Sequence, residues 1–224
     1  MAKAPYISII IPTMNERRSI AKTIKGIKDI MKGYDYEIIV VDTSKDKTPE
    51  IARRLGARVL TYKKKGKGAA LIYGFKQARG KIIISMDADL SNRPKELKLL
   101  IAGIEAGYDV CMGSRFLVGG GSEDMPLIRR FGNKLFVSMV NLLFGSHYTD
   151  MCYGYRSFSK LALKRLRLEE EGFGIETEMN IKAQKAGLRI LEVPSFEKRR
   201  QGGAGKLRTF HDGYIILSTI LRNI

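Results

Sequence analysis

The sequence predicts an α/β domain built on a mostly parallel, doubly wound sheet with helices on both faces. Three observations support this fold class. Strand and helix patterns alternate about five times in the first half of the chain. The strand candidates are short β-branched runs without polar alternation, which is typical of strands buried on both faces. Three of these runs end in polar turns, and the carboxyl ends of parallel strands meet at one sheet edge, where ligands bind.

The first half of the chain supplies the alternation. Residues 6–11 form a strand that stops at Pro12, because proline cannot donate to a central ladder. Isoleucines at spacings of four and three predict the helix that follows, around residues 20–30. Further strands are predicted at 36–41, 58–61, 82–85 and 108–112. Helices are predicted between them, from Thr48 to Leu55, from Gly68 to Ala78 and from Pro94 to Ala106.

The second half has a different character and begins with a glycine-rich loop at residues 119–122. Residues 126–145 form an amphipathic helix with one apolar stripe and a basic start. Such a helix either packs its stripe on the core or lies in a membrane interface. A helix at 175–186, a strand at 188–193 and a final helix at 210–224 complete the chain.

Length, charge and cysteine usage limit the class of protein. The chain has 224 residues, of which 44% are hydrophobic and 28% charged, as in ordinary soluble domains. Its formal net charge of +17 predicts an anionic partner, which could be nucleic acid, anionic lipid or a phosphorylated substrate. The distant Cys111 and Cys152 indicate neither a disulfide framework nor a zinc site, and a reducing cytosol fits them best. We expect no signal peptide and no bilayer-spanning segment.

Two carboxylates, Asp87 and Asp89, directly follow the buried strand at 82–85. Acids at this position are costly to desolvate unless a positive charge lies on them. A hard divalent cation with oxygen ligands, and a diphosphate bound through it, would satisfy them. Alternatively, both acids only end the strand and cap the next helix, since the pattern is common in proteins. The polar turns after the neighbouring strands favour the metal site.

Several further motifs follow one another along the chain. They are P-T-M-N-E at 12–16, V-D-T-S-K-D at 41–46, G-K-G-A-A at 66–70, G-S-R at 113–115, D-M-C-Y-G-Y-R at 150–156 and R-Q-G-G-A-G-K at 200–206. Together with the acid pair, and in this order, they resemble the motifs of the family-2 glycosyltransferases of the GT-A fold. The resemblance is greatest to the branch that makes polyprenyl-phosphate and dolichyl-phosphate sugars. It covers roughly residues 7–206.

The resemblance implies a single GT-A domain with a Rossmann-like, mostly parallel sheet and amphipathic helices on the acceptor side. It implies a nucleotide-sugar-binding half at 1–113, an acceptor-binding half at 114–208 and a C-terminal helix at 209–224. The implied activity is the metal-dependent, inverting transfer of a hexose from a nucleoside-diphosphate sugar to a polyprenyl or dolichyl phosphate. GDP-mannose and UDP-glucose both remain open as the donor.

The resemblance also implies residue roles. Mg²⁺ or Mn²⁺ is expected on Asp87, Asp89 and Ser91, where Ser91 replaces the Gln that this branch often carries. The nucleobase of the donor is expected to be recognised by Asp42 alone, because Val41 replaces the family's first acid. The nucleotide sugar is expected to contact Pro12, Thr13, Asn15, Glu16, Asp42, Ser44, Lys67, Asp87 and Ala88. Catalytic roles are expected for Asp89, Arg115, Asp150 and Arg200. The acceptor phosphate is expected to bind Arg129, Arg130, Arg156 and Lys206, since cationic side chains, above all the guanidinium fork, suit phosphate.

The nature of the acceptor decides whether a base is required. A phosphate acceptor is already anionic and needs only positioning and charge compensation. A sugar hydroxyl, as in glycan or polysaccharide assembly, would need a carboxylate base, for which Asp150, Glu176 and Glu178 are the candidates.

Three other protein classes fit the sequence less well. A nucleic-acid-binding protein would explain the charge, but basic residues alternate with acids and no recognition motif appears. The glycines at 66–68 lack the upstream Gly and the following Ser/Thr of a P-loop. A sugar-phosphate nucleotidyltransferase would carry a glycine-rich loop between the first strand and the first helix, and this chain does not.

The expected lipid acceptor lies in a membrane, yet no stretch of the sequence is long enough to span one. We therefore expect a peripheral protein on the cytoplasmic face of an anionic membrane. It would dock through residues 126–145, the basic loop near Arg200 and the last helix.

Overall fold

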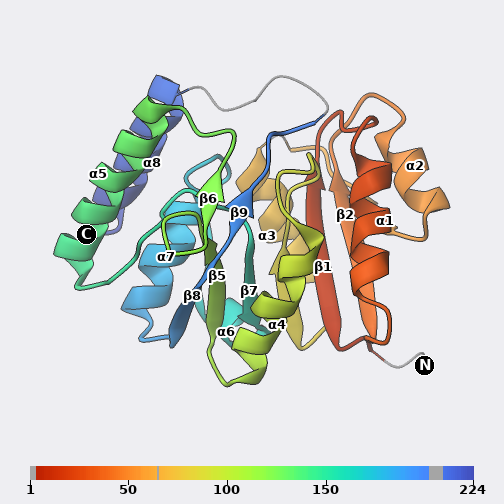
Figure 1. The fold of residues 1–224 in the computed structure, drawn as a ribbon, viewed down its shortest axis with the longest axis horizontal. Helices are drawn as coiled ribbons and strands as arrows, with labels where there is room; N and C mark the ends of the chain where they lie inside the picture. The colour runs from red at the N-terminus through yellow and green to blue at the C-terminus, as the bar shows by residue number, and fades with distance from the viewer. Residues whose placement is uncertain (1–3, 65, 202–208) are drawn as a thin grey trace.

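The computed structural model describes residues 4–64, 66–201 and 209–224. Its frame is a seven-stranded sheet in the order β3-β2-β1-β4-β7-β5-β8 (Figure 1). The strands are β1 (Ile7–Thr13), β2 (Tyr36–Asp42), β3 (Arg58–Thr61), β4 (Ile82–Ser85), β5 (Val110–Ser114), β7 (Arg156–Ser159) and β8 (Ile190–Pro194). The short strands β6 (Gly121–Ser122) and β9 (Phe196–Glu197) pair in a separate two-stranded sheet.

Eight α-helices lie in the described residues. They are α1 (Ile20–Ile30), α2 (Thr48–Arg54), α3 (Lys67–Gln77), α4 (Leu97–Glu105), α5 (Leu127–Phe144), α6 (Lys160–Arg165), α7 (Ile175–Lys185) and α8 (Thr209–Arg222). A 3-10 turn, η1 (Pro94–Glu96), precedes α4. The strands and helices predicted in the first half all occur, with ends shifted by a few residues.

The sheet is mostly parallel, as predicted. The pairs β1–β2, β1–β4, β2–β3 and β5–β8 are parallel. The exception is β7, which runs antiparallel between β4 and β5 and was not predicted. Its sequence, R-S-F-S, has one apolar residue, Phe158, so neither hydrophobicity nor β-branching marks it as a buried strand.

Helices cover both faces of the sheet because consecutive strand residues point to opposite sides. In β1, Ile9 and Ile11 pack in a core with α1 and α4. The residue between them, Ile10, packs on the other face with α3, α6 and α7. A third, smaller core joins α5, α7 and α8 around Val140 and Ile220. The predicted doubly wound arrangement is therefore confirmed.

Helices α5 and α8 pack against each other at one end of the molecule (Figure 1). The apolar stripe predicted on residues 126–145 is mostly exposed rather than in the core. Leu127, Phe131 and Leu142 are 81%, 72% and 85% exposed. Phe210 and Tyr214 of α8 are also exposed. No helix within the described residues has the length and apolarity needed to cross a bilayer.

Candidate active site

A cavity of about 640 Å³ opens at the carboxyl ends of β1 and β4 and extends to α5 and α8. Eleven of the residues given a site role in the sequence line it: Pro12, Thr13, Glu16, Lys67, Asp87, Ala88, Asp89, Arg115, Arg129, Glu176 and Arg200. Eight others lie outside its lining: Asn15, Asp42, Ser44, Ser91, Arg130, Asp150, Arg156 and Glu178. Lys206 lies outside the described residues. The polar turns of separate strands are thus brought to one place, as the sheet topology predicts.

Asp87 forms one side of a three-residue charge cluster. The Lys67 Nζ lies 2.9 Å from Asp87 Oδ1 and 2.9 Å from Glu176 Oε1. Burial lowers the pKa of Lys67, but the two carboxylates outweigh it and hold the pKa above its ordinary value. Gly154 lies directly against the cluster, because a Cβ there would be 2.8 Å from Nζ and 3.1 Å from Oε1. Lys67 therefore stays protonated, and a side chain at position 154 would have to displace its ammonium group.

The backbone explains why Lys67 and Glu176 meet. Lys67 is the first residue of α3, whose N-terminal amides have no partner within the helix. The Gly68 N–H donates to the Gly172 carbonyl at 3.2 Å, and the Ala69 N–H donates to the Glu171 carbonyl at 3.0 Å. These bonds fix the loop before α7 on the start of α3, which places Glu176, in the first turn of α7, beside Lys67.

Asp89 is held by the segment that follows β9. The Arg200 Nη2 lies 3.0 Å from Asp89 Oδ2, and the Ser91 N–H donates to Asp89 Oδ1 at 3.0 Å. Two main-chain hydrogen bonds hold this segment along the acid pair. The Lys198 N–H donates to the Ser91 carbonyl, and the Gln201 N–H donates to the Asp89 carbonyl, both at 2.9 Å. The described part of the predicted basic loop, residues 198–201, thus adjoins the predicted metal site.

The chemistry of the acid pair fits a hard divalent cation. Asp87 and Asp89 present carboxylate oxygens to the cavity, and no cluster of three or more His, Cys, Asp or Glu metal ligands occurs among the described residues. A cation held there would take its remaining oxygen ligands from a diphosphate and water, as Mg²⁺ does in phosphate sites. Ser91 is buried. Its N–H donates to Asp89 Oδ1, and its carbonyl accepts from the Lys198 N–H.

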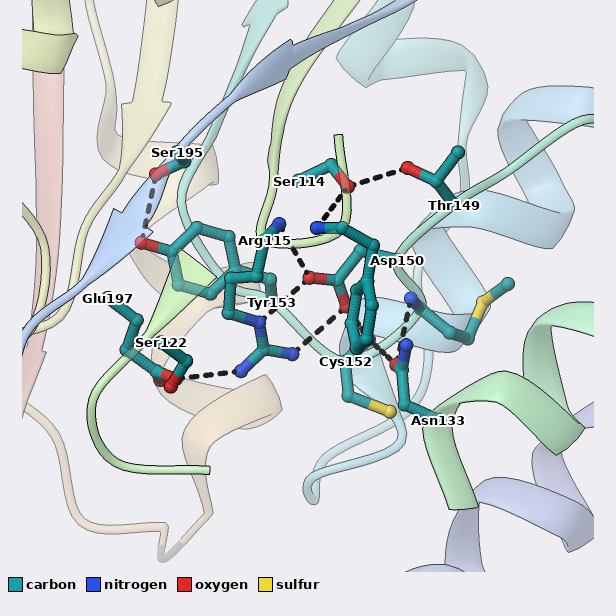
Figure 2. Close-up of polar contacts among 12 residues, drawn as sticks. Ser114, Arg115, Ser122, Asn133, Thr149, Asp150, Cys152, Tyr153, Ser195 and Glu197 are labelled. Carbon is teal, nitrogen blue, oxygen red and sulfur yellow. Dashed lines mark hydrogen bonds and ion pairs between the residues drawn. The ribbon is translucent and has the colours of Figure 1, made fainter. Parts of the chain in front are cut away.

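Arg115 and Asp150 form a buried ion pair (Figure 2). Asp150 has no exposed surface. It accepts hydrogen bonds from Arg115 Nε at 2.8 Å, Arg115 Nη2 at 2.9 Å, the Arg115 N–H at 3.2 Å and the Cys152 N–H at 3.2 Å. The remaining Arg115 nitrogen, Nη1, lies 3.1 Å from Glu197. The guanidinium also stacks over the Tyr153 ring, 4.8 Å from its centroid.

This geometry differs from the catalytic role expected for Asp150. A carboxylate with no exposed surface and four donors cannot reach a substrate proton. Glu178 is also buried, and it accepts from the N–H groups of Glu169 and Glu170 and from Lys182. Of the three candidate bases, Glu176 alone lines the cavity, and it is bound to Lys67.

The turns after β1 and β2 are joined through Asp42. Asp42 Oδ1 accepts from Thr13 Oγ1 at 2.7 Å and from Ser44 Oγ at 2.6 Å. The Asn15 N–H donates to Ser44 Oγ at 2.7 Å, and Asn15 Oδ1 accepts from Lys45 N–H at 2.9 Å. Asn15 has φ 59°, a left-handed conformation that asparagine tolerates better than most residues. These residues build the wall beside the cavity, and Thr13 faces it.

The cations expected at the acceptor phosphate are separated by the fold. Arg129 lines the cavity from α5, whereas its neighbour Arg130 is exposed outside the lining. Arg156 has no exposed surface, because it begins the unpredicted strand β7. It donates to Asn180 Oδ1 at 2.7 Å and to the Glu176 carbonyl at 3.3 Å, and burial lowers its pKa. Arg156 therefore joins β7 to α7 and does not reach the acceptor side of the cavity.

Sequence reasoning missed several residues that the structure places here. Tyr153 and Glu197 complete the surroundings of Arg115, and Asn133 and Phe136 line the cavity from α5. A signal existed only for Tyr153, which lies inside the D-x-x-x-G-x-R motif.

Residues 8–167 match the family model described as Glycosyl transferase family 2. Dolichol-phosphate mannosyltransferase of Pyrococcus furiosus is 34% identical over 210 residues, which are 90% of this chain and 59% of that protein. Dolichyl-phosphate hexose transferase of Haloferax volcanii is 31% identical over 216 residues, which are 96% and 92% of the two chains. This chain therefore spans less than two thirds of the first relative and nearly all of the second.

Among solved structures, glucosyl-3-phosphoglycerate synthase of Mycobacterium tuberculosis superposes with a TM-score of 0.77 at 22% identity. The match covers 98% of this chain and 80% of that one. It confirms the GT-A fold expected from the motifs. The family match and the two relatives lead to one conclusion: the chain belongs to glycosyl transferase family 2.

Proposed function

We propose that this chain transfers a hexose from a nucleoside-diphosphate sugar to a polyprenyl or dolichyl phosphate. The observation that carries the proposal is the composition of the cavity. Asp87, Asp89 and Lys67 line it at the end of β4 and the start of α3, which we call the floor, and the exposed Phe131 and Phe210 line it from α5 and α8, which we call the apolar wall. A charged floor suits a diphosphate, and an apolar wall that continues into exposed helix faces suits a phosphate attached to a hydrocarbon chain. The names of both relatives, a dolichol-phosphate mannosyltransferase and a dolichyl-phosphate hexose transferase, support the same acceptor.

We further propose that Asp87 and Asp89 hold Mg²⁺ or Mn²⁺. The ion would supply Lewis acidity toward the departing nucleotide. The Mycobacterium tuberculosis synthase crystallised with Mn²⁺ and UDP supports this choice of cofactor. The same complex favours a uridine donor, whereas the name of the Pyrococcus relative favours a mannose donor. UDP-glucose and GDP-mannose are therefore both candidates for the donor.

The chain's own residues would position the two substrates. Lys67, fixed between Asp87 and Glu176, places a positive charge beside the expected diphosphate. On the acceptor side, Arg129 lies on the cavity wall, where it can offset the charge of an acceptor phosphate. An oxygen of this phosphate would attack the anomeric carbon in line with the departing nucleotide and invert it. Residues 1–113 would thus bind the donor, and 114–208 with the last helix the acceptor.

The second candidate acceptor is a sugar hydroxyl, which the position of Glu176 at the cavity favours. A base on Glu176 would have to accept a proton while Lys67 is 2.9 Å away. The Lys67 ammonium already binds Glu176 Oε1, so a hydroxyl acceptor would have to displace this ion pair. We therefore place the phosphate acceptor first.

We also propose that α5 and α8 rest on the cytoplasmic face of an anionic membrane. Their exposed apolar residues adjoin the apolar wall of the cavity, so a lipid chain could pass between bilayer and cavity. The net charge of +17 would add attraction to anionic headgroups.

The proposal is tested by incubating purified chain with each donor and a short prenyl phosphate, with Mn²⁺, Mg²⁺ or a chelator. We expect a prenyl-phosphate hexose, detected by mass, with one donor and only with metal. The variant Asp89→Asn should lose transfer by at least ~100-fold, because a metal contributes several kcal/mol. The control Asp29→Asn, whose side chain is 71% exposed, should keep wild-type transfer. Transfer to a glycan hydroxyl with none to a prenyl phosphate would contradict the proposal.

A further inference from the structure

The side-chain amide of Asn133 has a donor without a partner at the wall of the cavity. Asn133 is on α5, is 3% exposed and lines the cavity. Its Nδ2 is buried and has no hydrogen-bond partner among the described residues. An unpaired buried donor costs about 1–3 kcal/mol, and most buried polar groups in native proteins are paired. A ligand atom in the cavity would supply the missing acceptor.

The orientation of this amide is fixed by its other end. Asn133 Oδ1 accepts from the Cys152 N–H at 3.2 Å (Figure 2). It also accepts from the Met151 N–H at 3.1 Å. Exchanging the oxygen and nitrogen would replace these bonds with two donor–donor contacts. The nitrogen therefore stays the free end of the amide.

The position of Asn133 indicates which substrate would bind it. Asn133 lies four residues after Arg129, so the two side chains share one face of α5, and both line the cavity. Helix α5 also gives the cavity its apolar residues Ile128 and Phe136. The donor-side residues come from other elements, namely β1, α3 and the turn after β4. A ligand at Asn133 thus lies where the charged and apolar parts of the acceptor side meet.

We infer that Asn133 Nδ2 donates a hydrogen bond to a phosphate oxygen of the acceptor, one helical turn from Arg129. This inference rests on the proposed function. The nitrogen is shielded from water in the free chain, so the lining side chains must adjust as the phosphate enters. Asn133 then helps to position the acceptor phosphate, and it also holds the Met151–Cys152 backbone in place.

The first test is the variant Asn133→Asp, which keeps the shape and the Oδ1 acceptor but replaces the donor with an anionic oxygen. We expect the KM for a short prenyl phosphate to rise at least ~10-fold, because one hydrogen bond to a charged group is lost. The KM for the sugar nucleotide should change less than about twofold, because Asn133 is inferred to contact only the acceptor. The control is Asn141→Asp on the same helix, where Oδ1 accepts from the Tyr148 N–H and Nδ2 donates to the Tyr148 carbonyl. It should leave both KM values unchanged.

An unchanged acceptor KM in Asn133→Asp would overturn the inference while leaving the proposed function intact. A wild-type chain that transfers to no prenyl phosphate would overturn the proposed function and the inference with it. Equal increases in both KM values would also overturn it, because they would indicate a general structural role.

A second measurement does not depend on a folded variant. The Asn133 side-chain NH₂ resonance of ¹⁵N-labelled wild-type chain is followed during titration with citronellyl phosphate, inorganic phosphate or citronellol. We expect a downfield proton shift with citronellyl phosphate and none with citronellol. The same shift from inorganic phosphate would support the hydrogen bond and identify free phosphate as a sufficient source. A resonance that no phosphate moves would overturn the inference.

Discussion

Replacing Asp150 with asparagine separates a structural role of this carboxylate from a catalytic one. Asn preserves the shape of the side chain but removes the charge that faces the Arg115 guanidinium at 2.8 and 2.9 Å. It also directs an NH₂ group at donors, because Asp150 accepts four hydrogen bonds and donates none. The substitution therefore leaves Arg115, whose side chain is 7% exposed, with part of its charge uncompensated.

The expected cost follows from the partners that remain. Removing one member of a buried ion pair costs about 3–5 kcal/mol. Glu197 stays 3.1 Å from Arg115 Nη1, and the Tyr153 ring still lies under the guanidinium, so we expect the lower end, about 3 kcal/mol. In a chain of this length each kcal/mol lowers the Tm by roughly 2–4 °C, so the Tm should fall by roughly 6–12 °C.

Scanning calorimetry of Asp150→Asn beside wild-type chain measures this loss. The control Asp29→Asn, in an exposed pair with Lys32 at 3.6 Å, should shift the Tm by no more than a few degrees, because exposed pairs contribute at most about 1 kcal/mol. Transfer is also measured well below both midpoints. A Tm within 2 °C of wild type, combined with a turnover lowered by roughly 100-fold or more, would refute the structural role and make Asp150 a general base.

Four further outcomes are expected. Gly154→Ala should weaken sugar-nucleotide binding roughly tenfold by calorimetry, because its Cβ would lie 2.8 Å from the Lys67 Nζ; an unchanged Kd contradicts this. Phe131→Ser should lower binding to anionic liposomes roughly 10- to 100-fold by flotation, whereas Leu161→Ser, equally exposed on α6, should not. Burial raises the pKa of both cysteine thiols to about 12, so alkylation at pH 8 should be at least ~100-fold slower in native chain than in guanidinium. Chelation of divalent metal should abolish transfer while leaving the Tm of ligand-free chain unchanged.

The sequence was sufficient for most of the fold because most of the buried strands have a local signature. Runs such as I-S-I-I-I and I-I-I-S carry their β-branched content in four or five residues, and the turns after them carry the polar groups. Strand β7 has no such signature. Arg156 pairs with Ser85 and Phe158 with Ile83 only because β4 and β5 leave a gap that an antiparallel strand fills. That preference is tertiary and leaves no pattern in four residues.

The candidate site was predictable where its residues follow the ends of parallel strands and unpredictable where they come from other loops. Thr13, Asp87 and Asp89 could be placed together because parallel strands end at one edge. The pairing of Lys67 with Glu176 depends on how the loop before α7 binds the start of α3, which no motif records. The sequence likewise could not reveal that Arg156 is buried, since its motif is continuous with residues that do line the cavity.

The charges at the floor of the cavity explain why two cations are bound to acids that are expected to bind metal. Four carboxylates, on Asp87, Asp89, Glu176 and Asp124, face two cations, on Lys67 and Arg200, which leaves two formal negative charges. Without these cations, the acids of this cavity would stand uncompensated, at a high cost in desolvation and repulsion. A divalent ion would offset the two remaining negative charges and favour a diphosphate. Because the positive charge of the metal and the negative charge of the diphosphate offset each other, binding of one should increase the affinity for the other. Arg200, once released from Asp89, would keep a positive charge at the place where the phosphates arrive.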